Sequence, residues 1–184
     1  MNQYLALLRG INVGGKNIIK MAELKTCFEA QGYQRVRTYI QSGNVLFFSD
    51  EPDRARLAGQ IEEALSKTFD YESRAVLRSF DEVKEVVGSA PEDFGSEPET
   101  YRYDVIFLKE PLTAVEAMES VTAREGVDRA FAGNGVLYFS RLISRASQSH
   151  LTRIIGTPVY QSLTIRNWNT TTKLLEMMRA GDRF

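Results

Sequence analysis

Apolar residues recur along the chain at two spacings. A short run or a two-residue repeat is typical of strands, and a three- or four-residue repeat is typical of helices. Tyr4–Leu8 is a short apolar run in front of a glycine-rich loop, and it predicts a buried strand. Met21, Leu24 and Phe28 share one helical face, and Gly32 ends that helix. The chain is therefore expected to open with a strand, a loop and a helix.

A hairpin and an amphipathic helix are predicted next. Val36–Ile40 and Val45–Phe48 flank the tetrapeptide QSGN, which is turn chemistry between two strand-like runs. Leu57, Ile61 and Leu65 lie four residues apart after a proline, which is the pattern of a helix with one apolar face. We therefore expect two antiparallel strands followed by a helix.

A short strand, a capped helix and a linker complete the first half. Ala75–Leu77 predicts the strand. Ser79 and Glu82 have the spacing of a capping box, which opens a helix through Val87. The next stretch, GSAPEDFGSEPE, is rich in Gly, Pro, Ser and acidic residues, and this composition indicates a linker.

The same order of elements then starts again. Tyr103–Leu108 predicts a strand, and Leu112–Ser120 predicts a helix with Val115 and Met118 facing inward. After a second hairpin, the chain is expected to form a helix through Leu151, Ile154 and Ile155, a strand at SLTIR and a closing helix at NTTTKLLEMM.

The two hairpin segments are similar in sequence. VRTYIQSGNVLFFS, from Val36, and VDRAFAGNGVLYFS, from Val127, agree without a gap at five positions, and this alignment pairs Phe47 with Tyr138. An internal repeat of this kind determines the whole fold prediction. We predict an α+β fold of two ferredoxin-like (βαββαβ) subdomains related by the repeat, plus a C-terminal helix. The predicted boundaries are residues 1–88, a linker at 89–100 and residues 101–184.

Composition restricts the chemistry. The single cysteine, Cys27, excludes an internal disulfide, and the single histidine, His150, leaves too few ligands for a Cys/His zinc site. No apolar run approaches the roughly 18 residues of a membrane helix, and the N-terminus lacks the pattern of a signal peptide. We expect a cytoplasmic protein without a metal, a cofactor or a membrane partner.

Charge is distributed unevenly. The net charge is −1, but residues 1–40 carry six basic and two acidic residues, and residues 141–184 carry seven and two. The middle, 41–140, carries ten basic and twenty acidic residues. One interpretation is a mixed surface on which the ends pair with the middle. The other is that both ends contribute to one anion-binding face.

The first loop is close to a phosphate-binding motif. Gly10–Asn17, GINVGGKN, fits the pattern G-x-x-x-x-G-K-[ST] except at its last position. Asn17 supplies no hydroxyl for magnesium, and the helical pattern begins only near Met21, about a turn late. We therefore predict no magnesium-dependent hydrolysis of ATP or GTP.

The loop can still be a ligand site or simply a tight turn. Its glycines allow positive φ, which serves a turn and also permits close approach of a ligand to the backbone. Positive charge and amide groups suit an anion. The candidate residues in this loop are Arg9, Asn12, Gly14, Gly15, Lys16 and Asn17.

A second polar cluster lies near the C-terminus, in TIRNWNTTTKL. Arg166 ends a predicted strand, and Asn169 is expected to cap the closing helix, with Trp168 packed over the join. The structural interpretation is a capped helix. The functional one is that Arg166, Asn167 and Asn169 bind a phosphate or carboxylate at the helix start.

The motifs LLRGINVGGKN, MAEL, RTYIQSGNVLF and TIRNWNTTTKL resemble those of the bacterial family called domain of unknown function 1697. The resemblance extends from Tyr4 to about Leu175. It implies a fold of two ferredoxin-like subdomains, and it implies no activity. The family pattern often has a proline before the Met-Ala-Glu-Leu helix, where this chain has Lys20.

Catalytic chemistry has little support in the sequence. Cys27 lies on the helix face that is expected to be buried, which predicts an inert thiol. His150 lies near Ser147 and Ser149, but a solvated histidine at a helix terminus is the simpler interpretation. No pattern places two carboxylates across a cleft.

Three classes of function stay open. The first is a module that binds a phosphate-bearing or other anionic ligand, such as a nucleotide, a phosphorylated metabolite or single-stranded nucleic acid. An RNA site would need outward aromatic residues among Phe47, Phe48, Tyr138 and Phe139 on an exposed sheet face. The second is an enzyme acting on a small anionic metabolite, which needs a general base that the sequence does not identify. The third is a structural or interaction protein, for example a homodimer.

The two long motifs suggest a common site. The glycine-rich loop follows the first strand, and the Arg-Asn-Trp-Asn turn follows the last. Each lies in a basic third of the chain. We therefore predict that both segments line one electropositive cleft between the halves, with Arg9 and Arg166 as its charged donors.

Overall fold

The computed structural model describes residues 1–181, and the chain divides into two compact units. Unit 1 contains residues 1–83 together with the chain from residue 178, and unit 2 contains residues 84–177. The division falls inside two helices, α3 (Phe80–Gly88) and α5 (Trp168–Gly181). The stretch 89–100, predicted as a linker, belongs to unit 2. The predicted subdomain boundaries stay a prediction.

Unit 1 is built on a four-stranded antiparallel sheet in the order β2-β3-β1-β4. The hairpin predicted at residues 36–49 is present, as β2 paired with β3. Its strands are β1 (Asn2–Leu8), β2 (Gln34–Tyr39), β3 (Asn44–Ser49) and β4 (Ala75–Ser79).

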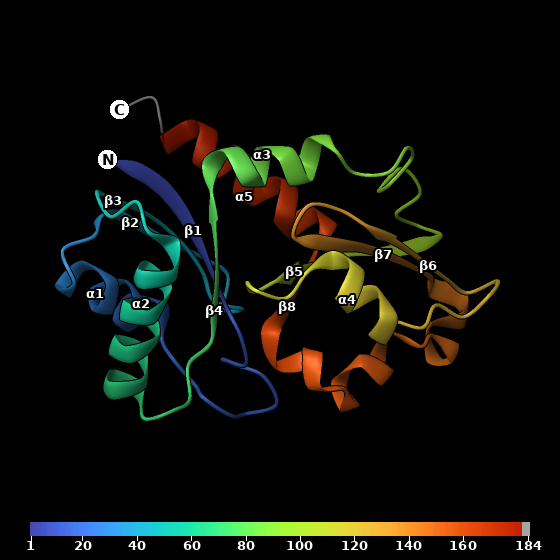
Figure 1. Cartoon of the computed structure of the whole chain (residues 1–184), viewed down its shortest axis with the longest axis horizontal. Helices are drawn as coiled ribbons and strands as arrows, with labels where there is room; N and C mark the ends of the chain where they lie inside the picture. Colours follow the sequence, from blue (N-terminus) through green and yellow to red (C-terminus); the bar gives the residue numbers. More distant parts are fainter. Residues whose placement is uncertain (182–184) are drawn as a thin grey trace. The chain divides into compact units, whose positions relative to one another are not determined.

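Two helices, α1 (Met21–Ala30) and α2 (Arg54–Phe69), cover one face of this sheet (Figure 1). Leu24 and Phe28 of α1 and Ile61 of α2 are fully buried against Ala6 and Phe47 of the strands. The capping box predicted at Ser79 and Glu82 is formed, because each side chain accepts the backbone amide of the other residue. The sequence pattern therefore predicted unit 1 element by element.

Unit 2 contains a second four-stranded antiparallel sheet, in the order β6-β7-β5-β8. The second predicted hairpin is also present, as β6 paired with β7. Helix α4 (Ala114–Ser120) supplies Ala117 to the core on one face, and a single 3-10 helix supplies Leu151 and Ile154. The strands are β5 (Tyr101–Leu108), β6 (Asp128–Ala132), β7 (Val136–Leu142) and β8 (Leu163–Asn167).

Three predictions for unit 2 are corrected. The single helix expected through Leu151, Ile154 and Ile155 is replaced by the 3-10 helices η1 (Ile143–Gln148), η2 (Leu151–Gly156) and η3 (Pro158–Ser162). Val115 faces solvent with 72% of its surface exposed, and Ala117 takes the inward position. Helix α5 begins at Trp168, so Asn169 lies inside it and does not precede it.

The gap-free alignment of the two hairpin sequences is also wrong by one residue when β3 on β1 is compared with β7 on β5. Tyr138 pairs with Val105 of β5, and Leu46 pairs with Leu5 of β1. Because side chains alternate between faces, a slip of one residue exchanges the inward and outward sets. Phe47 and Phe139 each lie in the core of their own unit, whereas the alignment had paired Phe47 with Tyr138.

Candidate functional site

The glycine-rich loop is held by the side chain of Asn12. Its Nδ2 donates to the carbonyl oxygens of Ile19 (3.0 Å) and Gln41 (2.9 Å), and its Oδ1 accepts from the Ile19 amide (2.8 Å). Asn17 Nδ2 donates to the Gly10 carbonyl at 2.8 Å. Both asparagines adopt left-handed backbone conformations. Their side chains therefore shape the loop.

The tip of the loop is a tight turn. The Lys16 amide donates to the Val13 carbonyl at 3.0 Å, and Gly14 and Gly15 between them have φ of 59° and 74°. Lys16 is exposed, whereas Arg9 at the base of the loop is half-buried. Helix α1 begins only at Met21, so its first amides do not face this turn as they do in a phosphate-binding loop.

The Arg-Asn-Trp-Asn turn lies at the start of α5. Asn167 Oδ1 accepts the amide of Thr170 at 2.7 Å, so Asn167 is the capping residue predicted at Asn169. Arg166 is only 7% exposed, and its guanidinium donates to Thr164 Oγ1 and to the Ile165 carbonyl, both at 2.8 Å. Burial lowers the pKa of Arg166 to about 10.

A cavity of about 240 Å³ opens beside this turn, and we call it the α5 pocket. Asn167 and Asn169 both line it, while Arg166 does not. Aromatic, amide and guanidinium groups therefore meet in one cavity within unit 2. The full lining consists of Gly95, Pro98, Tyr101, Arg102, Tyr103, Ile143, Asn167, Trp168 and Asn169.

Aromatic packing fixes one wall of the α5 pocket. Phe94 packs edge-on against Trp168, with ring centroids 5.1 Å apart, and against Tyr103 at 5.0 Å. Gly95 has φ of +90°, and a Cβ there would lie 2.4 Å from Trp168 Nε1. The residue after Phe94 must therefore be glycine for the indole to occupy this position.

A charged cluster lies on the sheet next to the pocket. Asp104 is 6% exposed, and its Oδ2 lies 3.6 Å from an Arg141 nitrogen. Burial raises the pKa of Asp104, and the charges of Arg141 and Arg102 act in the opposite direction. Asp128, equally buried, accepts the amides of Arg124 and His150. Neither carboxylate lines the α5 pocket.

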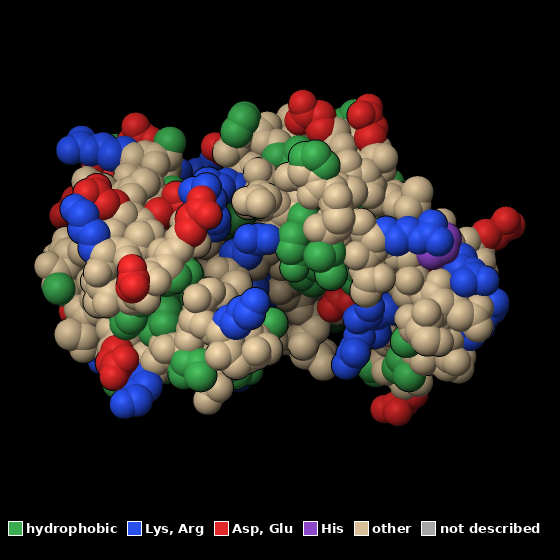
Figure 2. Space-filling model, turned by 90° about the horizontal axis from the view of Figure 1, so that it is seen from below, with side chains coloured by type: hydrophobic (Ala, Val, Ile, Leu, Met, Phe, Trp, Pro, Cys, Tyr) green, Lys and Arg blue, Asp and Glu red, His purple; other side chains and the backbone are tan. Residues whose placement is uncertain are grey.

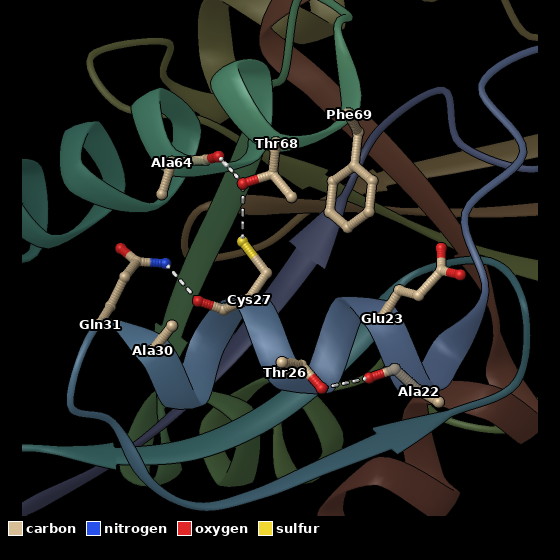
Figure 3. A pocket seen from close by; sticks show the side chains of 9 residues that line it. All are labelled: Ala22, Glu23, Thr26, Cys27, Ala30, Gln31, Ala64, Thr68 and Phe69. Atoms are coloured by element: carbon tan, nitrogen blue, oxygen red, sulfur yellow. Dashed lines mark hydrogen bonds between the residues drawn. The ribbon is translucent and has the colours of Figure 1, made fainter.

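A larger groove of about 670 Å³ runs between α1 and α2 of unit 1, and we call it the α1–α2 groove. Figure 3 shows Cys27 reaching from α1 toward Thr68 on α2, and Cys27 Sγ donates to Thr68 Oγ1 at 3.6 Å. Cys27 as a residue is 8% exposed, and its position on the helix had predicted this burial. The lining consists of Ala22, Glu23, Thr26, Cys27, Ala30, Gln31, Ala64, Thr68 and Phe69.

The aromatic residues of the third strands do not form a platform for RNA bases. Phe47 and Phe139 are fully buried, and Tyr138 is 2% exposed and donates its hydroxyl to the Val86 carbonyl. Phe48 is half-buried, with the Arg35 guanidinium 5.3 Å from its ring centroid. This arrangement argues against base stacking on either sheet.

The single histidine lies in a basic part of unit 2. Figure 2 shows Lys or Arg side chains beside it. Arg145 of η1 donates to the Gln148 side chain, and Arg124 donates to the Gln148 carbonyl. Among residues 1–181, no group of three or more Asp, Glu, His or Cys side chains is arranged to hold a metal ion. No helix in the same range is long and apolar enough to cross a membrane.

The predicted site residues thus fall into two groups. Arg9, Asn12, Gly14, Gly15, Lys16 and Asn17 gather in the loop of unit 1, and Arg166, Asn167 and Asn169 gather in unit 2. The common cleft joins residues of different units and stays a prediction. Sequence reasoning missed Tyr101, Arg102 and Tyr103. The alternation of aromatic and basic residues in YRYD, directly after the predicted linker, was the available signal.

Comparison with known proteins identifies relatives but no activity. No curated protein matches the chain. A solved structure, that of the conserved bacterial protein SP0830 from Streptococcus pneumoniae, is 26% identical in sequence, and the match has a TM-score of 0.84. It covers 97% of this chain and 99% of that one. This chain therefore shares its fold with that solved structure over nearly its whole length.

The model of the family described as "Protein of unknown function (DUF1697)" matches residues 1–138. This range includes the glycine-rich loop and the first hairpin, whose motifs suggested the same family. The chain therefore belongs to the DUF1697 family of proteins of unknown function.

Proposed function

We propose that this protein binds a small anionic ligand, bearing a phosphate or a carboxylate, in the α5 pocket. The observation that carries the proposal is the convergence of Arg102, Asn167 and Asn169 on one cavity at the start of a 14-residue helix. The positive end of the helix dipole favours an anion there, and the guanidinium adds a charge-assisted donor.

Three features support an anion in this position. Arg102 is exposed, so its guanidinium is hydrated and able to reorient toward a ligand. Asn167 and Asn169 are also exposed and carry amide groups. Within residues 1–181, no acidic side chain lines the pocket, although Glu97 and Glu99 flank Pro98 in the chain. The local charge of the lining is therefore positive.

Trp168 makes the proposal directly measurable. It is the only tryptophan of the chain and it lines the pocket, so its fluorescence reports on this cavity. We expect inorganic phosphate to change Trp168 emission in a saturable way. A charge-assisted hydrogen bond contributes roughly 1.5–3 kcal/mol, so Arg102→Ala should weaken phosphate binding about ten- to a hundredfold.

The control variant is Arg153→Ala. Arg153 is an exposed arginine of unit 2 outside the pocket lining, so its loss changes net charge equally. Equal weakening by both variants would mean a diffuse electrostatic effect and would contradict the proposal, as would the absence of any saturable response. Lys16→Ala in the same titration tests the predicted contribution of the glycine-rich loop.

The enzyme alternative requires a base near the ligand. Asp104 has the raised pKa that a general base would need, but it does not line the pocket that we propose as the site. We therefore propose binding and not catalysis. Turnover of a phosphorylated metabolite that disappears in Asp104→Asn would reverse this preference.

For the architecture, we infer that the two sheets represent one ferredoxin-like (βαββαβ) unit repeated within the chain. The orders β2-β3-β1-β4 and β6-β7-β5-β8 support this inference, since each strand has a counterpart at the same place. The Leu8 amide donates to the Gly43 carbonyl, and the Leu108 amide donates to the Gly135 carbonyl. Buried Arg78 pairs with Leu5 as buried Arg166 pairs with Val105.

A further inference from the structure

The volume and the aromatic lining of the α5 pocket indicate which kind of anion it can bind. Its volume of about 240 Å³ lies below the roughly 300–1,000 Å³ typical of sites for larger ligands. An apolar cavity of about 150 Å³ accommodates benzene. The α5 pocket therefore has room for one six-membered ring and an anionic group.

The walls present aromatic rings to such a ligand. Tyr101, Tyr103 and Trp168 all line the pocket and are half-buried, so part of each ring remains accessible. Tyr101 and Tyr103 have ring centroids 6.1 Å apart, and the Arg129 guanidinium lies 5.3 Å from the Tyr101 centroid. The rings are thus held by neighbours before a ligand arrives.

Along the chain, the polar residues of the pocket alternate with the residues that carry the aromatic rings. Arg102 lies between the two tyrosines along β5, so its side chain leaves the strand on the side opposite theirs, and all three residues line the pocket at the start of the strand. Asn169 follows Trp168 in the first turn of α5. A ligand with a ring at one end and an anionic group at the other can therefore meet both kinds of side chain.

We propose that the α5 pocket recognises a planar, single-ring aromatic anion such as an aryl phosphate or an aryl carboxylate. This inference rests on the proposed anion-binding function and adds the ring as the second recognition element. The ring contacts Tyr101 and Trp168, and the anionic group is bound by Arg102 and the start of α5.

The test compares phenyl phosphate with methyl phosphate, using Trp168 emission and calorimetry. Both carry the same anionic group. We expect phenyl phosphate to bind about two- to tenfold more tightly, the range expected for an added aromatic contact. Replacing Tyr101 by leucine should bring the ratio of the two affinities close to one. The matched control is Phe131→Leu, an exposed aromatic residue of β6 outside the lining.

The outcomes separate the two proposals. Equal binding of phenyl and methyl phosphate overturns the ring inference and leaves the anion site standing. Binding of neither compound overturns the anion site itself. Binding of phenol as tight as phenyl phosphate also overturns the anion site, because the ring alone would then account for affinity. A preference that survives Tyr101→Leu contradicts the assignment of the ring contact.

Discussion

At the scale of single residues, Gly95 determines the shape of the α5 pocket. Its positive φ and its contact with the Trp168 indole both exclude a side chain. The shape of the pocket therefore depends on a glycine, a residue with no side chain that could bind a ligand.

We expect Gly95→Ala to lower the free energy of unfolding by about 1–3 kcal/mol, because the left-handed backbone is strained and the indole must move. Urea denaturation measures the loss, and Trp168 emission should shift. The control is Gly59→Ala, where an added Cβ in α2 meets no atom within 4 Å. That change should stabilise the protein by about 0.5–1 kcal/mol. An unchanged stability and emission spectrum for Gly95→Ala would disprove this role.

Asp104 gives the stability a pH dependence with a definite sign. Burial raises its pKa in the folded state above the ordinary value of 3.8, so the folded protein favours the protonated acid. The contribution of Asp104 to stability is therefore full below pH 3.8 and is lost as the pH rises through the folded-state pKa.

Asp104→Asn should remove this contribution. We expect the stability of the wild type relative to the variant to fall as the pH increases above 3.8, which paired urea titrations at several pH values measure. A difference that rises with pH would show that the attraction of Arg141 exceeds the cost of burial.

At the scale of elements, the start of α5 is defined by one side chain. Because Asn167 accepts the Thr170 amide, Asn167→Ala should cost about 0.5–2 kcal/mol of stability. Asn169→Ala removes no capping bond and should change stability by about 0.5 kcal/mol or less. Thermal and urea unfolding of the two variants compare them directly. The reverse ranking would restore Asn169 as the cap.

The elements that the sequence predicted well are those with local signals. Both hairpins were recognisable because turn residues separate β-branched and aromatic runs, and α2 because three buried leucine and isoleucine residues share one face. The inward faces and the helix types of the short elements could not be predicted from the sequence in the same way. The seven residues of α4 contain too few turns to distinguish Val115 from Ala117 as the inward residue, and repeated 3-10 turns imitate a helical spacing at Leu151 and Ile154.

Only part of the candidate site could be predicted from the sequence, because some of its contacts join residues that are far apart in the chain. Asn167 and Asn169 could be found because polar residues at a helix start have a recognisable pattern. The contact between Gly95 and Trp168 joins residues far apart in the chain, and no local pattern encodes it. The burial of Arg166 is likewise a property of the folded sheet, since an arginine at a strand end is usually solvated.

At the scale of the whole molecule, the last turn of α5 belongs to the unit that contains β1. Met178 is fully buried, and its carbonyl accepts a hydrogen bond from Gln3 Nε2 at 3.1 Å within unit 1. Truncating the chain after Met177 should therefore lower the free energy of unfolding of unit 1 by about 2–5 kcal/mol, the cost of losing a buried methionine side chain.

Hydrogen exchange can locate this effect. The amides of β1 and β3 should exchange faster in the chain that ends at Met177, while those of β5 and β7 keep most of their protection. A chain ending at Met178 retains the buried side chain and is the matched control. Uniform loss of protection over both sheets would mean that the two units unfold as one.

The place of Met178 also has a consequence for protein synthesis. All strands of unit 1 are complete at Ser79, yet the ribosome must still add the whole of unit 2 before Met178 is made. At about 5–20 residues per second this delay lasts on the order of 5–20 s. During that time the carboxamide of Gln3 lacks its acceptor, so β1 of the nascent chain remains without this hydrogen bond until Met178 has been added.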